Sequence, residues 1–350
     1  MRQALPVAIT LSAGMAGALV FYWIGAPAAF LVGSAVAVTG AVAARLPTSL
    51  PAALRDPALA ILGVMMGAGV HPEALGALAT IPLAVLGLIL AITGATVASY
   101  VVLRQVGRWD PVTALCGSIP GALQVTMATA IEAGARMDRV VMAQALRLLI
   151  LVSLVPLVFG GGDAPSIRTF SPPGADTLTV LVSVVIGVGS GYLGKLVKIP
   201  SAILIVPLCV SAILSTTGLV TIAIPTWLAA IAFVVLGASV AQRFDGMAGA
   251  DILPALRISL LAFVAAFAAA VLVAAAFRPL LGEPLGAVFL AYAPGGVDAM
   301  IVLAFLLKFD VSFVAVLHVT RLLALSVGAP LVVAYVRRRV AGNGRAHIGG

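Results

Sequence analysis

The chain has 350 residues, of which 62% are hydrophobic and 9% are charged. Soluble domains carry about a quarter charged residues, so this composition excludes a soluble protein and predicts a polytopic membrane protein. The net charge of +8 does not indicate nucleic-acid binding, because the basic residues stand singly at the ends of apolar runs, as in cytoplasmic loops.

Six apolar segments are expected in the first half of the chain. The run from Leu5 to Ile24 could pass for a signal peptide, but further apolar segments follow it at once. We therefore interpret it as the first transmembrane segment. The next segments are expected at 28–45, 56–71, 80–103, 112–133 and 138–160.

A Gly/Pro/Ser-rich stretch from Gly161 to Asp176 separates this set from a second one and is typical of a linker. Six more segments are expected at 177–194, 200–217, 224–242, 255–277, 285–306 and 311–336. The resulting organisation is a first membrane repeat at 1–160, a linker at 161–176, a second membrane repeat at 177–336 and a basic cytoplasmic tail at 337–350.

The two sets of segments resemble each other in sequence. An offset of 174 residues places Pro120-Gly121 on Pro294-Gly295 and Arg147 on Arg321. Over the 39 ungapped pairs that begin at Pro120 and Pro294, eleven are identical. This ordered similarity predicts an internal duplication.

The distribution of basic residues favours an inverted arrangement of the two repeats. If all twelve segments cross the membrane, eleven basic residues lie inside. If the segments at 112–133 and 285–306 instead dip in and return, fifteen lie inside and only Arg168, Arg278 and Lys308 lie outside. We therefore predict an all-α transmembrane fold. Each repeat has five crossings and one Pro/Gly-broken re-entrant hairpin, and both termini are cytoplasmic.

The two hairpin tips are the strongest candidates for a binding site. Proline lacks an N–H group and glycine tolerates a positive φ, so each Pro-Gly pair breaks its helix at membrane depth. The second arm then starts with free N–H groups that favour an anion. The simpler alternative is a pair of kinks. The candidate substrate-binding residues at the tips are Pro120, Gly121, Gln124, Pro294, Gly295, Gly296 and Asp298.

Arg147 and Arg321 are candidates for the same site, because a charge near the bilayer centre costs at least about 2.5 kcal/mol. Each follows a polar residue by three positions, Gln144 in the first repeat and His318 in the second, so each pair shares one helix face. The arginines could bind an anion or pair with Asp298 or Glu132. Alternatively, they could hold the backbone carbonyls of the hairpin tips as a scaffold.

Asp298, His318 and Gln144 are the candidates for ion coupling. A carboxylate at membrane depth could bind a proton or Na⁺, and a histidine could relay protons. The alternatives are an aspartate that caps its helix and a histidine that packs through a hydrogen bond. The coupling ion, Na⁺ or H⁺, stays open, and no other cofactor is expected.

Catalytic and metal-binding patterns are missing from the sequence. It contains no HExxH, P-loop or Ser/His/Asp order. The two cysteines, Cys116 and Cys209, stand in separate apolar segments without the spacing of a zinc site. We therefore expect no enzyme activity and no metal site.

The pair SIPGALQVT…AQALRLL and YAPGGVDAM…LHVTRLL, with Pro27 to Gly33 upstream, resembles the AbrB family of bacterial membrane proteins over nearly the whole chain. That resemblance implies an internally duplicated inner-membrane protein. Members of the family are labelled as regulators or as ammonia monooxygenases. This sequence supports neither label, because it contains no DNA-binding element and no metal cluster. The predicted architecture is also similar to that of citrate and glutamate sodium symporters.

Together these features predict a secondary transporter of a small organic anion or zwitterion that binds between the two hairpin tips. The alternative is a membrane regulator or sensor that does not transport and acts through a partner protein, with the basic tail as its contact. The expected partners are a small-molecule substrate and the lipid bilayer, and not nucleic acid. A homodimer is one of the assemblies left open.

Overall fold

The protein is helical throughout the residues that the structure describes. This computed structural model describes residues 4–70, 81–120, 123–160, 176–199, 201–244 and 252–346, and their side chains except those of 123–125, 252 and 339–346. These ranges contain fourteen α-helices and no strand. The all-α prediction is therefore confirmed for this part of the chain.

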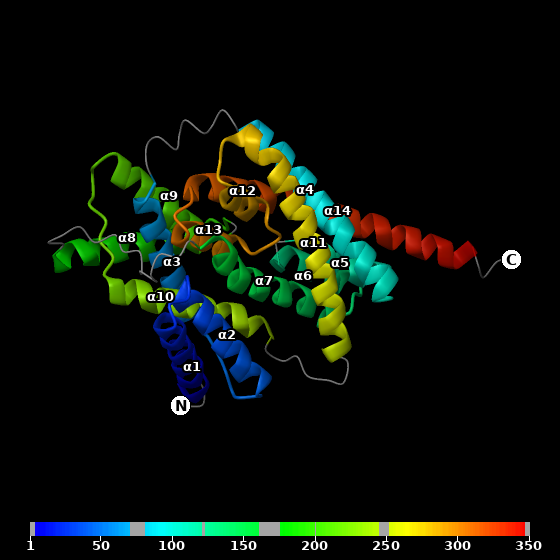
Figure 1. Cartoon of the computed structure of the whole chain (residues 1–350), viewed down its shortest axis with the longest axis horizontal. Helices are drawn as coiled ribbons and strands as arrows, with labels where there is room; N and C mark the ends of the chain where they lie inside the picture. Colours follow the sequence, from blue (N-terminus) through cyan, green and yellow to red (C-terminus); the bar gives the residue numbers. More distant parts are fainter. Residues whose placement is uncertain are drawn as a thin grey trace. The chain divides into compact units, whose positions relative to one another are not determined.

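The helices follow the predicted segments closely, and the two segments that contain Pro-Gly are each divided into two short helices (Figure 1). In the first half they are α1 (Ala4–Trp23), α2 (Ala29–Ala43), α3 (Ala52–Ala68), α4 (Ile81–Val101), the π-helical extension η2 (Val102–Val106), α5 (Pro111–Ser118), α6 (Leu123–Glu132) and α7 (Met137–Phe159). In the second half they are α8 (Thr177–Leu196), α9 (Ala202–Thr216), α10 (Thr226–Ala241), the 3₁₀ turn η3 (Gln242–Phe244), α11 (Ile252–Leu281), α12 (Leu285–Tyr292), α13 (Val297–Leu306) and α14 (Val311–Ala346).

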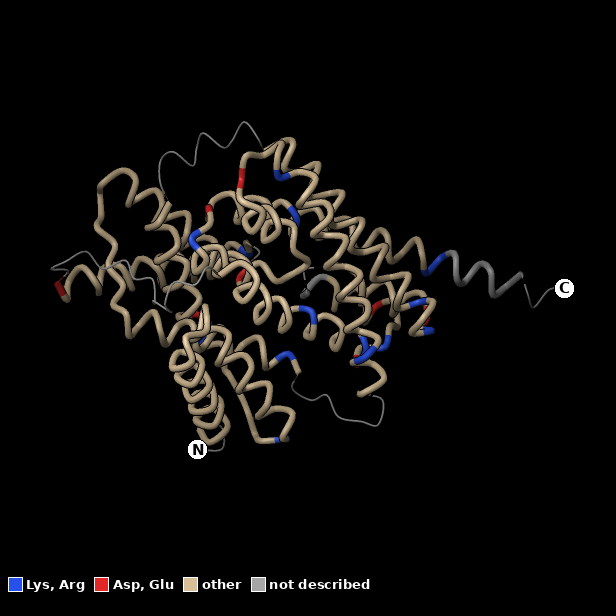
Figure 2. The backbone as a smooth tube through the Cα atoms, viewed as in Figure 1, with Lys and Arg blue, Asp and Glu red and all other residues tan. Residues whose placement is uncertain are grey.

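Seven of the described helices are long and apolar enough to cross a membrane: α1, α4 with η2, α7, α8, α10 with η3, α11 and α14. In lipid every backbone polar group must be satisfied internally, and such helices do so within one segment. Charged residues are sparse along them (Figure 2). The protein is therefore a multi-pass membrane protein.

Helix ends follow local sequence signals. Asp110 caps α5 by accepting a hydrogen bond from the Thr113 N–H at 2.9 Å, and Asp176 caps α8 by accepting one from the Thr179 N–H at 2.9 Å. Hydrogen bonds from the Thr179 hydroxyl and N–H hold the pKa of the exposed Asp176 carboxyl below its ordinary value. The last helix continues to Ala346, ten residues beyond its expected end at 336.

The chain forms two compact units, and each takes helices from both halves of the sequence. Unit 1 contains α1 to α3, α7 from Leu149 onward, α8 to α10, α13 from Asp298 onward and the start of α14 up to Ala315. Unit 2 contains α4 to α6, α7 up to Leu148, α11, α12 and α14 from Val316 onward. The expected linker at 161–176 lies, except for Asp176, outside the described residues, and the division into sequential repeats stays a prediction.

Unit 1 is built on close contacts between helices from the two halves. Gly67 of α3 lies against Ser211 and the Leu208 carbonyl of α9. Gly237 of α10 lies against Ser34 and the Leu31 carbonyl of α2. Small residues let helix backbones approach closely in a membrane, where packing rather than the hydrophobic effect drives association.

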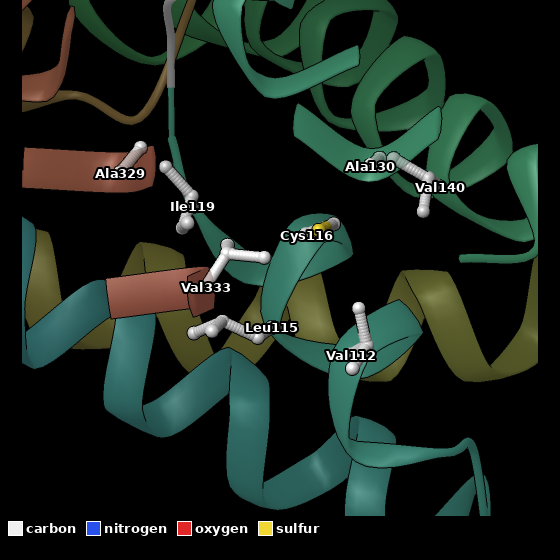
Figure 3. Close-up of a cluster of buried hydrophobic side chains, with 8 residues drawn as sticks. All are labelled: Val112, Leu115, Cys116, Ile119, Ala130, Val140, Ala329 and Val333. Carbon is white, nitrogen blue, oxygen red and sulfur yellow. The ribbon is translucent and has the colours of Figure 1, made fainter. Parts of the chain in front are cut away.

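Unit 2 packs the first broken helix against the last helix of the chain. Val112, Leu115 and Cys116 of α5, with Ile119 just after it, form one buried cluster with Ala329 and Val333 of α14 (Figure 3). The apolar side chains of this cluster hold α5 in place without using its polar groups. The backbone carbonyls at the end of α5 are therefore left for other partners.

Candidate functional site

Both Pro-Gly segments interrupt the helix by the same backbone geometry. After α5, Ile119 is extended with φ −61° and ψ 121°, and after α12, Ala293 is extended with φ −55° and ψ 136°. Each of these residues precedes a proline, whose ring excludes the helical conformation from the residue before it. The carbonyls of the last helical turn consequently lose their usual partners at two places in unit 2.

Side chains of α7 hold the carbonyls of the first break. Arg147 Nη2 donates to the Gly117 carbonyl at 2.7 Å, and Arg147 Nη1 donates to the Ile119 carbonyl at 3.3 Å. One turn earlier, Gln144 Nε2 donates to the carbonyls of Cys116 at 3.1 Å and Ile119 at 3.2 Å. The guanidinium fork and the amide together replace the N–H donors that the proline break removes.

Side chains of α14 hold the second break in the same way. Arg321 Nη1 donates to the Ala293 carbonyl at 2.5 Å, and Arg321 Nη2 donates to the Gly295 carbonyl at 2.6 Å. His318 Nε2 lies 3.0 Å from the Leu290 carbonyl. Arg147, Gln144, Arg321 and His318 are all buried. The scaffold contacts considered from the sequence are therefore present, and they do not exclude a second role.

The charge of the two arginines is not neutralised within the described part of the chain. No ion pair there joins Arg147 or Arg321 to a carboxylate, and the two like charges are close enough to repel each other. Arg147 Nε is also buried with no hydrogen-bond partner, and so is Nδ1 of His318. A buried polar atom without a protein partner is costly, so each of these nitrogens is a candidate to bind a ligand, an ion or water.

The other predicted site residues lie in different surroundings. Pro120, Pro294 and Gly295 are buried, and Gly296 is half-buried. Gly121 lies outside the described residues, and so does the side chain of Gln124, although its backbone belongs to α6. The exposed Glu132 accepts a hydrogen bond from Arg337 through its backbone carbonyl at 3.2 Å. The predicted pairing of its carboxylate with Arg147 or Arg321 is not among the described contacts.

Asp298 is the second residue of α13 and belongs to unit 1. There it is half-buried and interacts electrostatically with Arg243 of η3 and Arg55 of α3. Its predicted pairing with Arg321, which belongs to unit 2, stays a prediction.

Polar interactions of Asp56, Arg243 and Tyr292 are among those that were not predicted from the sequence. The buried Asp56 carboxylate of α3 bridges its neighbour Arg55 at 2.9 Å and Lys195 of α8 at 2.8 Å. Arg243 lies near Asp298, as described above. The Tyr292 hydroxyl donates to the Ala84 carbonyl of α4 at 3.0 Å. Asp56 at the start of an apolar segment was the one available signal, because an acidic residue there requires a partner.

Metal binding has no support in the described residues, since no group of three His, Cys, Asp or Glu side chains there could hold an ion. What unit 2 does contain is two broken helices, two buried guanidinium groups and two unpartnered nitrogens. Donors that are fixed at a buried position without a counter-charge can bind an anion.

Comparison with known proteins agrees with the resemblance noted in the sequence. Residues 30–337 match the family described as transition state regulatory protein AbrB. A protein of Escherichia coli (strain K12) named "Putative regulator AbrB" is 25% identical over 323 residues, which is 89% of this chain and 90% of that protein. No solved structure matches the chain. The chain, with its two proline-broken helices held by buried arginines, belongs to the AbrB family.

Proposed function

We propose that the protein is a secondary transporter, rather than an enzyme, and that it carries a small organic anion or zwitterion by alternating access. The single observation that carries this proposal is the pair of buried arginines, each hydrogen-bonded to the carbonyls of a broken helix and neither paired with a carboxylate among the described residues. Two uncompensated charges at membrane depth are costly, and charged residues there usually have a function.

The chemistry of this site favours a negatively charged group on the substrate. The carbonyls fix each guanidinium group through its Nη atoms, and Arg147 keeps an unused Nε–H donor. The helices that follow the breaks, α6 and α13, also begin with the positive end of a helix dipole, which favours an anion. A carboxylate of the substrate would satisfy these donors and offset the charge of both arginines.

The proposal includes an internal duplication, which the backbone geometry supports independently of sequence identity. Left-handed φ values occur at ten described residues, five in each half, and each residue of the first half has a counterpart 173 or 174 positions later. The pairs are Gly25 and Lys198, Ala28 and Ser201, Arg45 and Gly218, Arg108 and Gly282, and Gly134 and Lys308. Such residues mark sharp chain reversals, so the two halves turn at equivalent places.

One of these pairs offers a test of the shared backbone. Gly218 has φ 69° and open space around it, whereas the exposed Arg45 has φ 59°. We expect Gly218→Ala to lower the free energy of unfolding by about 1 kcal/mol, because only the backbone conformation opposes the added methyl group. Arg45→Gly should leave the free energy of unfolding unchanged or raise it slightly. Thermal denaturation in detergent measures both, and a stabilised Gly218→Ala variant would contradict the assignment.

The proposal also includes an inverted topology. α5 and α6 have eight and ten residues, as do α12 and α13, and at about 1.5 Å per residue neither helix of a pair crosses the membrane alone. Each pair then forms a re-entrant hairpin, and the five other segments of each half cross the membrane. An odd number of crossings inverts the second repeat, and the distribution of basic residues favours cytoplasmic termini in an inner membrane.

Alternating access requires two bodies that move against each other, and the two compact units are the natural choice. Unit 1 takes α1 to α3 and their counterparts α8 to α10, and unit 2 takes α4 and α5 and their counterparts α11 and α12. The substrate would bind beside the hairpin tips of unit 2, and Asp298 of unit 1 stays a candidate for coupling to Na⁺ or H⁺. A homodimer is one assembly in which one unit could stay fixed in the membrane.

Uptake into liposomes tests the proposal. Purified protein should accelerate the entry of radiolabelled succinate or glycine betaine relative to empty liposomes, with succinate as the anion and glycine betaine as the zwitterion. Gly295→Leu, which places a side chain at the buried second tip, should abolish uptake while the protein stays folded. Normal uptake by this variant would remove the second tip from the mechanism.

A second candidate function is that of a regulator, because the Escherichia coli relative bears that name. In this role the basic tail would contact a partner protein. Deleting the residues after Arg339 separates the two functions. Loss of a cellular phenotype with succinate or glycine betaine uptake intact would favour the regulator, whereas unchanged phenotype and uptake would favour the transporter.

A further inference from the structure

The ring of His318 has one nitrogen that the fold uses and one that it does not. Nε2 lies 3.0 Å from the Leu290 carbonyl, and a carbonyl oxygen can only accept a hydrogen bond, so Nε2 carries the hydrogen. In a neutral ring Nδ1 is then a lone-pair acceptor. This atom is buried and has no partner in the described part of the chain, and the side chain as a whole is 0% exposed.

The first half of the chain shows that holding the tip does not require a histidine. Gln144 and His318 are 174 residues apart, and so are the carbonyls that they contact, those of Cys116 and Leu290. The Gln144 amide donates to its tip from Nε2 and has no basic nitrogen. The difference between the two positions is therefore the free Nδ1 of His318, which can accept a proton.

Burial and the neighbouring guanidinium groups both oppose a positive charge on the ring of His318. Arg321, one turn further along α14, acts on the ring directly, and Arg147 of α7 acts on Arg321. The remaining titratable group on α12 is Tyr292, whose hydroxyl donates to the Ala84 carbonyl. Like charges repel more strongly where water is excluded, so a third positive charge here needs a negative partner.

We propose that His318 is the coupling residue of the transporter and that its Nδ1 binds a proton from water when the anion binds to the arginine pair. This inference rests on the proposed function and names its coupling ion as H⁺. A bound anion offsets the guanidinium charges, and by linkage the proton and the anion each strengthen the binding of the other. Both then cross together and separate on the other side, where Nδ1 returns its proton to water.

Nitrogen NMR on the full-length protein tests the resting state and the linkage. The chain has three histidines, so ¹⁵N-histidine labelling gives few signals, and His318→Gln identifies the one from His318. In a buffer whose only anion is too large to enter the site, we expect a hydrogen on Nε2 of His318 and none on Nδ1. At about pH 6, near the ordinary titration range of histidine, adding succinate should raise the protonated fraction of Nδ1. Hydrogen on Nδ1 in the resting protein, or no response to succinate, would overturn the proposal.

A transport assay is the second test of the proposal. His318→Gln is the matched variant, because Gln144 makes the equivalent contact at the first tip. With the membrane potential clamped at zero, wild-type liposomes should accumulate succinate about tenfold for each pH unit of gradient, as one coupled proton requires. The variant should show no response to the gradient, and an unchanged response would overturn the proposal. If succinate binding leads to protonation of His318 but succinate is not transported, the proposed transport of this acid is wrong. The coupling between anion binding and proton binding is then still correct.

Discussion

Replacing Arg321 by methionine should abolish transport while leaving the protein folded in the membrane. The substitution leaves the buried Gly295 carbonyl without its side-chain donor, which costs about 1–3 kcal/mol. The Ala293 carbonyl also loses a donor but keeps the Gly295 N–H at 2.7 Å. The substitution also removes a buried charge, which relieves about 2.5–3.5 kcal/mol on insertion scales. The two effects nearly cancel in global stability, so the loss is local to the tip.

Hydrogen exchange measures that local loss. The backbone N–H groups of Ala293 and of residues 295–297 should exchange at least about 30-fold faster in Arg321→Met, since about 2 kcal/mol of local stabilisation corresponds to that factor. Arg147→Met should have the same effect on the first break. Unchanged exchange at the tip, together with normal uptake of succinate or glycine betaine, would show that the arginines neither hold the tips nor bind the substrate.

The lysine variants separate charge from geometry. Arg321→Lys keeps the positive charge, but a single ammonium group does not reproduce the planar fork that spans the Ala293 and Gly295 carbonyls. We therefore expect Arg321→Lys to lose most of its uptake. Full activity of this variant would mean that the positive charge alone is required, and the scaffold role of the guanidinium group would then be wrong.

The second large effect is expected where helices from the two halves touch in unit 1. A Cβ atom at Gly67 would overlap Ser211 Oγ and the Leu208 carbonyl, and one at Gly237 would overlap Ser34 Oγ and the Leu31 carbonyl. A backbone carbonyl cannot move aside without shifting its helix. Gly67→Ala and Gly237→Ala should therefore each lower the free energy of unfolding by about 1–3 kcal/mol.

Two glycines within the same unit provide the control. Gly40 of α2 and Gly189 of α8 have open space where a Cβ atom would be, so alanine there should raise the free energy of unfolding by up to about 1 kcal/mol through helix propensity. Thermal denaturation of the four variants in one detergent makes the comparison. Equal stability of Gly67→Ala and Gly40→Ala would contradict the close approach of α3 and α9.

Much of the fold could be predicted because apolar runs and prolines act locally. The segment expected at 28–45 is α2 at Ala29–Ala43, and the breaks fall at Pro120 and Pro294 because each proline restricts the residue before it. The family could also be predicted, since the repeated Pro-Gly and Arg-Leu-Leu residues carry the resemblance.

The partners of the polar side chains could be predicted only in part. Arg147 had three candidate partners in the sequence, and its contact with the Gly117 carbonyl depends on how α7 lies against α5. The bridge from Asp56 to Lys195 joins residues 139 positions apart on α3 and α8, and no local pattern encodes it. The compact units could not be predicted either, because each combines helices from both halves.

Solute counterflow tests the central claim, that the arginine-held site carries an anion by alternating access, most directly. Liposomes loaded with unlabelled succinate are diluted into a trace of radiolabelled succinate. The expected result is a transient accumulation of label in wild-type liposomes, with none in Arg321→Met or empty liposomes, because a carrier exchanges one bound molecule for another. Simple equilibration of label would indicate a channel, and no entry of label would contradict transport of this anion.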